Sequence, residues 1–165
     1  MALYNQEQIH VIASKIKEVQ FGMLTTVDAN NRMSSRPLTS QQVDDEGNMW
    51  FFASDEAAFT HDLERHPAVN ISFARPDHHL YLSVSGHATL LRDRHKAQEL
   101  WNPLVKIWYV GGIDDPHLVL IRVKIHSAEY WDASSSKMKQ LLAIAKAAIT
   151  GERPGPVGEH TTICL

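Results

Sequence analysis

The histidines of this chain are numerous enough to raise the question of a metal site. There are ten among 165 residues. His61 and His66 are five residues apart on a predicted helix, whereas a helical zinc pair needs a spacing of four. His78 and His79 are neighbours in a predicted turn, and no cysteine or evident third ligand accompanies either pair. We therefore predict no metal site.

Groups for acid–base or nucleophilic catalysis are also weakly represented. Asp114, Asp115 and Glu129 could be general bases, but nothing in the sequence sets their pKa for that task. Cys164 is the only cysteine, so an intrachain disulfide is impossible, which fits a reducing cytoplasmic setting. No nucleophile elbow, phosphate-binding glycine loop or paired-carboxylate motif is present. We assign no catalytic residue.

Arg36 is the strongest candidate for binding an anion. It stands between Ser35 and Pro37 in a predicted strand. Its planar guanidinium can bind two oxygens of one anion at once. The alternative is an exposed arginine in a weak surface ion pair.

The four tryptophans divide into two pairs. Trp50 and Trp131 lie in apolar predicted strands, so we expect them in the core. Trp101 and Trp108 lie two turns apart on one predicted helix, where they could pack as a seam or cover a planar ligand.

Short strands with peripheral helices are the elements that must position these residues. The clearest alternation of apolar and polar residues is LYLSVSGHATLL (80–91). The predicted strands are 21–27, 33–43, 49–53, 69–75, 80–91 and 117–131. The predicted helices are 6–18, 55–65 with Ser54 as its cap, one that begins at Asp93 and includes Trp108, and 135–150, followed by a polar tail at 151–165. The early hairpins are too tight for parallel crossovers, so we expect an antiparallel barrel in a single domain, 1–165.

The composition excludes several classes of protein. Hydrophobic residues make up 44% and charged residues 21%, which is typical of a globular protein. The formal charge of −3 and pI near 6.3 lack the basic excess that nucleic-acid binding needs. No segment has the length and apolarity of a membrane span or signal sequence. We expect a cytoplasmic protein with no nucleic-acid or membrane partner.

Eight segments resemble, in order, the general stress protein 26 group of pyridoxamine 5′-phosphate oxidase-related flavoproteins. They are MLTTVD (23–28), SSRPL (34–38), MWFFAS (49–54), LSVSG (82–86), LWNP (100–103), KIWYVGGIDDP (106–116), AEYWD (128–132) and KAAITGERP (146–154). The resemblance implies a mainly β protein: a six-stranded antiparallel split β-barrel of the FMN-binding type. It also implies a homodimer with cofactor clefts at the interface.

The resemblance further implies which residues contact FMN; FAD fits less well. Arg36, flanked by Ser35 and Pro37, corresponds to the arginine that reaches the phosphate or ribityl chain. Phe51, Phe52 and Ala53 correspond to the strand along the isoalloxazine edge. The remaining candidates are Ser54 and Thr60 near the phosphate, and Tyr81, Ser83, Trp101 and Trp108 from the second subunit.

The sequence departs from this family where relatives bind the phosphate. Relatives carry a hydroxyl residue and a lysine where this chain has Ala57 and Phe59. Asp55 and Glu56 add negative charge to the same predicted helix start. Losing the lysine contact and gaining the nearby negative charge should each cost about 1–3 kcal/mol of phosphate binding, and Thr60 and His61 could compensate in part.

Two functions follow. The first is an FMN-binding, stress-related flavoprotein, with a low-specificity flavin-dependent oxidoreductase as the possible activity. The second is a non-enzymatic split-barrel dimer that binds another small molecule, or flavin only weakly; heme or deazaflavin binding rests on fold analogy alone. True pyridoxamine 5′-phosphate oxidation is not expected, because RPGPVGEHTTICL (153–165) does not resemble the C-terminal extension that this activity uses.

Overall fold

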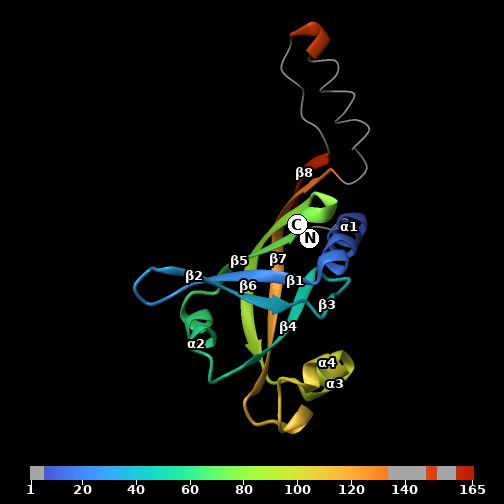
Figure 1. Ribbon diagram of the computed structural model, residues 1–165. Helices are drawn as coiled ribbons and strands as arrows, with labels where there is room; N and C mark the ends of the chain where they lie inside the picture. Colours follow the sequence, from blue (N-terminus) through green and yellow to red (C-terminus); the bar gives the residue numbers. More distant parts are fainter. Residues whose placement is uncertain (1–5, 134–147, 152–158) are drawn as a thin grey trace.

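A long antiparallel sheet dominates the computed structural model, which describes residues 6–133, 148–151 and 159–165. Within these residues eight strands form one sheet, whose main path runs β2-β1-β5-β6-β7-β4-β3, with β8 paired to β7 (Figure 1). The strands are β1 (Phe21–Val27), β2 (Met33–Thr39), β3 (Gln42–Val43), β4 (Asn48–Ser54), β5 (Ala68–Arg75), β6 (Leu80–Leu91), β7 (Leu118–Asp132) and β8 (Glu159–Cys164).

The helices lie around this sheet. The described helices are α1 (Gln6–Val19), α2 (Ala58–Arg65), α3 (Arg94–Leu100) and α4 (Pro103–Lys106), with short 3₁₀ turns η1 (Pro76–His78) and η2 (Gly112–Asp114). In Figure 1, α3 and α4 lie at one end of the β6–β7 pair and β8 at the other. No helix in the described ranges is long and apolar enough to cross a membrane.

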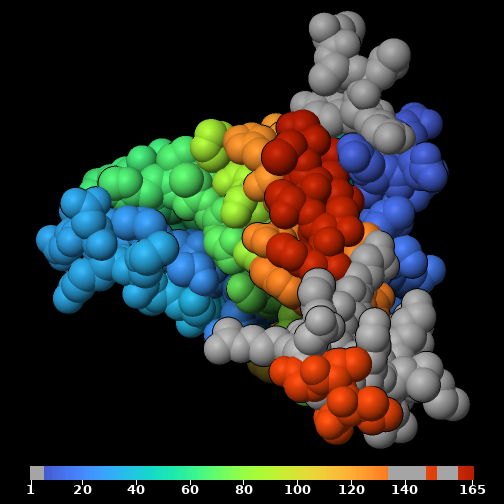
Figure 2. Space-filling model, turned by 90° about the horizontal axis from the view of Figure 1, so that it is seen from above, coloured from blue at the N-terminus to red at the C-terminus, as the bar shows by residue number. Residues whose placement is uncertain are grey.

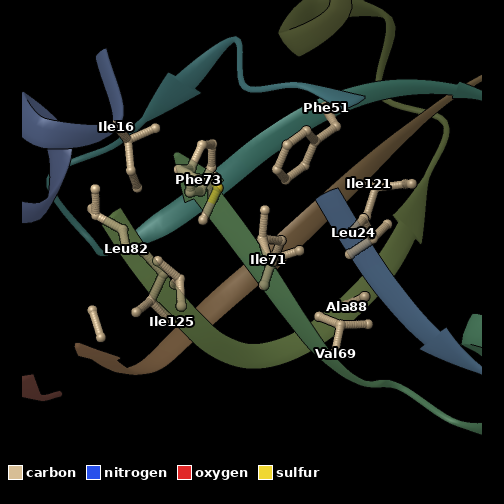
Figure 3. Close-up of a cluster of buried hydrophobic side chains, with 14 of the residues drawn as sticks. Ile16, Leu24, Phe51, Val69, Ile71, Phe73, Leu82, Ala88, Ile121 and Ile125 are labelled. Carbon is tan, nitrogen blue, oxygen red and sulfur yellow. The ribbon is translucent and has the colours of Figure 1, made fainter. Parts of the chain in front are cut away.

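The inward faces of the strands enclose the main core. Along β6, buried and more exposed residues alternate as the sequence predicted. Ile16 of α1, Leu24 of β1, Phe51 of β4 and Ile71 of β5 point into this core (Figure 3), and each is at most 2% exposed. These placements confirm a mainly β, antiparallel split barrel with peripheral helices, although the sheet is not closed and has eight strands instead of six.

A β-bulge in β7 explains why position 86 requires a glycine. The register between β6 and β7 shifts at Ser85/Gly86, and His126 is the extra residue. A Cβ atom at position 86 would lie 2.2 Å from the carbonyl oxygen of Lys124. Only glycine therefore allows the two strands to approach so closely there.

Strand β8 was not predicted. It pairs with β7 from Ser127↔Cys164 to Asp132↔Glu159, along the part of β7 beyond its pairing with β4. In Figure 2 the red surface of β8 lies between the orange surface of β7 and the blue surface of α1. The prediction of a polar tail over 151–165 is thus wrong for 159–164, while most of the predicted helix 135–150 lies outside the described residues.

The region from 93 to 108 also differs from its prediction. One continuous helix was expected, but α3 ends at Leu100 and α4 begins at Pro103. The side chain of Asn102 caps α4 by accepting hydrogen bonds from the amides of Leu104 and Val105. Asn102 followed by Pro103 is a sequence that starts a helix and therefore interrupts a longer one.

Candidate functional site

Arg36 is fixed by neighbours on β1 and β2. It pairs with Leu24 across the β1–β2 ladder. Its guanidinium donates to the carbonyl of Leu24 at 3.1 Å and to the hydroxyl of Thr26 at 2.7 Å. It also donates to the hydroxyl of Ser34 at 2.7 Å. A guanidinium has five N–H donors, so two donors have no acceptor among the described residues.

The ring of Phe59 packs against one face of this guanidinium. The Cζ atom of Arg36 lies 4.5 Å from the ring centroid, a cation–π contact between β2 and the first turn of α2. Partial burial lowers the pKa of Arg36, while the Asp62 carboxylate acts in the opposite direction. The guanidinium stays charged at neutral pH. The expected lysine is therefore replaced by an aromatic ring that orients the arginine.

The start of α2 lacks a side-chain cap. Its N-cap residue is Ala57, not Ser54, so the helix begins three residues later than predicted. The hydroxyl of Ser54 instead accepts from the amide of Glu56 at 3.2 Å. Thr60 is buried, and its hydroxyl donates to the carbonyl of Ala57 at 2.7 Å. Thr60 thus supports the turn with its hydroxyl.

Asp55 and Glu56 lie before the helix and have cationic neighbours. The Asp55 carboxylate accepts from Arg92 and from Nδ1 of His117, the latter at 2.9 Å. Nε2 of His117 is 3.6 Å from Glu56. Hydrogen bonding to Asp55 raises the pKa of His117, and the same bond lowers the pKa of Asp55. Both carboxylates were expected within the first turn of a helix, but they precede α2, and each has a cationic partner.

The predicted isoalloxazine-edge residues point to two sides of β4. Phe51, which is 0% exposed, and Ala53 are both buried in the main core. Phe52 belongs to a second cluster, where its ring meets Trp101 edge-on at 5.7 Å between centroids. Tyr109 completes this aromatic group at 6.5 Å from Trp101. Burial raises the pKa of Tyr109 to about 12.

Trp108 projects outward in a short apolar segment. Its side chain is 82% exposed, and Leu104 and Ile107 are exposed as well. Trp101 packs inward against Phe52, so the two tryptophans do not share one helix face as predicted. The break at Pro103 separates their directions.

Tyr81 and Ser83 lie on the outer face of β6. Tyr81 is directly opposite Trp131 of β7, and Trp131 is directly opposite His160 of β8. The Trp131 and His160 rings stack at 5.0 Å with planes 6° apart. Trp131 is 40% exposed, so its prediction as a core residue is wrong; it faces outward in the alternation of β7. The Ser83 hydroxyl accepts from the Asn70 amide.

Ser35 and Pro37 do not join Arg36 at its contact with Phe59. Both are exposed, and strand alternation directs them to the opposite face of β2 from Arg36. The Ser35 hydroxyl instead meets that of Thr25 at 2.6 Å.

Within one chain the predicted residues fall into three groups. Arg36 lies over the start of α2, Phe52 meets Trp101, and Tyr81 and Ser83 share the outer sheet face. Sequence reasoning missed the roles of Arg92 and His117, which are 37 and 62 residues from Asp55. A cavity of about 210 Å³ between the end of β6 and η2 is lined by none of the predicted flavin contacts, although Asp114 and Asp115, considered above as general bases, lie in its wall.

Comparison with known proteins tests the family resemblance. Residues 7–155 match the family model described as "Pyridoxamine 5′-phosphate oxidase like". Protein bli-3 of Neurospora crassa is 28% identical over 156 residues, which cover 88% of this chain and 75% of that protein.

Two solved structures extend the comparison. The general stress FMN/FAD binding protein of Xanthomonas citri is 30% identical, with a TM-score of 0.65 over 78% of this chain and 88% of that one. A protein related to general stress protein 26 from Clostridium acetobutylicum shares the fold, with a TM-score of 0.70, 14% identity and coverage of 98% and 96%. The resemblance found from the motifs is confirmed, and the chain belongs to the pyridoxamine 5′-phosphate oxidase like family.

Proposed function

We propose that this chain is an FMN-binding, stress-related flavoprotein. The observation that carries the proposal is the position of Arg36, held by β1 above the first turn of α2 with donors left for a ligand. A fixed arginine beside a helix start without a side-chain cap suits an anionic group such as a flavin phosphate. The Xanthomonas citri relative is described as an FMN/FAD binding protein, which supports a flavin as the ligand.

The remaining predicted contacts require a second copy of the chain. We infer a homodimer in which one protomer supplies Arg36 and β4, and its partner supplies Tyr81, Ser83 and Trp108. The exposed apolar side chains support this arrangement, because such surface is usually buried in an assembly. They include Phe21, Met33, Tyr81, Leu104, Ile107, Trp108 and Trp131.

A bound flavin would supply the redox chemistry through its isoalloxazine ring. The residues of this chain would bind and orient it: Arg36 the anionic end, strand β4 the ring edge, and Trp108 of a partner the exposed ring face. The activity we propose is that of a low-specificity oxidoreductase. The rival function is a dimer that binds another small molecule without catalysis.

Purification of the full chain tests the proposal. A yellow protein that releases flavin on denaturation, at about one flavin per chain, is the expected result. Sedimentation should give twice the mass of the chain, and Trp108→Ser should weaken flavin binding while leaving the unfolding midpoint close to that of the unmodified protein. Colourless protein that neither quenches FMN fluorescence nor shifts its unfolding midpoint with FMN up to high micromolar would favour the non-catalytic binder.

A further inference from the structure

The charges around Arg36 nearly cancel before any ligand arrives. Arg36 contributes one positive charge, and Asp62 is close enough to act on its pKa. Phe59, three residues before Asp62 in α2, is a neutral side chain whose ring lies beneath the guanidinium. At the helix start, Asp55 and Glu56 are matched against Arg92 and His117. The surroundings of Arg36 thus offer little excess positive charge.

Much of the hydrogen-bonding capacity of Arg36 is also committed. Its NH1 group donates hydrogen bonds to the Leu24 carbonyl and the Thr26 hydroxyl, and its NH2 group donates one to the Ser34 hydroxyl. Thr26 is buried, so its bond to Arg36 cannot be exchanged easily for one to water. The two donors that remain can reach at most two oxygens, whereas a phosphate monoester carries three terminal oxygens and a charge of about −1.5 to −2 near pH 7.

From this balance we infer that Arg36 alone compensates the terminal phosphate, so that the site distinguishes FMN from riboflavin only weakly, and that Phe59 sets this low selectivity. The inference rests on the proposed flavin function. FMN and riboflavin share the ring and the ribityl chain and differ by the terminal phosphate. Because the chain compensates little of the phosphate charge, the two ligands bind with dissociation constants within about tenfold of each other. Because the Phe59 ring is neutral, it adds no second positive charge to that of Arg36.

Titration of the full chain with riboflavin and FMN, followed by flavin fluorescence, tests this inference. The expected FMN preference is below about tenfold and changes little between low and high salt, since few charges are paired. An FMN preference above about a hundredfold would overturn the inference and leave the flavin function standing. If neither flavin binds, the proposed function fails and this inference fails with it.

Variants at Phe59 and Asp62 sharpen the test. Phe59→Lys adds a positive charge and should raise the FMN preference by about tenfold or more, whereas Phe59→Leu changes packing without charge and should leave the preference unchanged. Asp62→Asn removes a negative charge at a half-buried helix position without altering Phe59, so it provides a second route if Phe59→Lys does not fold. If each of these two variants changed the affinities for FMN and for riboflavin by the same factor, the FMN preference would not change, and the selectivity assigned to Phe59 would be contradicted.

Discussion

The guanidinium of Arg36 lies over the ring of Phe59, with 4.5 Å between the Cζ atom and the ring centroid. This contact joins β2 to α2 across 23 residues of sequence. It fixes the guanidinium that we propose binds the anionic end of the ligand. Phe59, at the position where the resemblance led us to expect a lysine, is thus part of the arginine's support.

Arg36 should therefore matter for stability as well as for ligand binding. Arg36→Leu would leave the buried Thr26 hydroxyl and the Leu24 carbonyl without their donor. We expect a loss of about 1–3 kcal/mol in the free energy of unfolding, measured by urea denaturation. Arg65→Leu, at the exposed end of α2, is the control and should cost less than about 1 kcal/mol. Equal losses for both variants would mean that the bonds of Arg36 are not stabilising.

Asp44 should support the hairpin between β3 and β4 in a pH-dependent way. Its burial would raise its pKa, but hydrogen bonds from the Trp50 indole and from Asn48 outweigh this and lower the pKa. Since the folded pKa is below the ordinary value of 3.8, the stabilisation is present above that value and is lost as pH falls through the lowered pKa. Asp44→Ala should cost about 1–3 kcal/mol at pH 7 and much less near pH 3.

The neighbouring Asp45 provides the control for that experiment. Its side chain is 86% exposed, so Asp45→Ala should change the unfolding free energy little at either pH. A penalty for Asp44→Ala that stays constant from pH 7 to pH 3 would contradict the assigned role of the ionised carboxylate.

His117 should titrate above its ordinary pKa of 6.5 because of its bond to Asp55. The stabilisation that the charged pair gives the folded protein is present below pH 6.5 and is lost as the pH rises through the raised pKa of His117. NMR titration of the imidazole should show the raised pKa, and Asp55→Asn should move it down. Asp45→Asn, at a different hairpin, should leave it unchanged; a His117 titration unaffected by Asp55→Asn would contradict the pairing.

Strand β8 should be a stabilising part of the sheet. Ile163 is 4% exposed and packs into the main core, so Ile163→Ala should cost about 2–4 kcal/mol in unfolding free energy. Thr162→Ala is the matched change one residue earlier, at an exposed side chain, and should cost under about 1 kcal/mol. Similar small losses for both would mean that β8 is not packed as described.

The parts of the fold with local signals were predictable from sequence. The alternation of β6, the apolar face of α1 and the turn before Asn48 each depend on residues a few positions apart. The eight motifs then identified the family, which the family model confirms.

The remaining features depend on contacts between distant residues. Strand β8 is polar on its outer side, and its stability comes from β7, more than 25 residues earlier. Phe59 could be recognised as a departure from the family, but its contact with Arg36 becomes visible only when α2 lies against β2. Likewise, the partners of Asp55 could not be inferred from the order of the residues alone.

Titration of the purified full chain with FMN is the most direct test of the central claim. Saturable quenching of flavin fluorescence at one FMN per chain, with a dissociation constant of about 10 µM or lower, is the predicted result and corresponds to roughly 7 kcal/mol. Arg36→Gln should weaken this binding while Arg65→Gln leaves it unchanged. Absence of saturation up to several hundred micromolar FMN, or equal binding by the Arg36→Gln variant, would contradict the account.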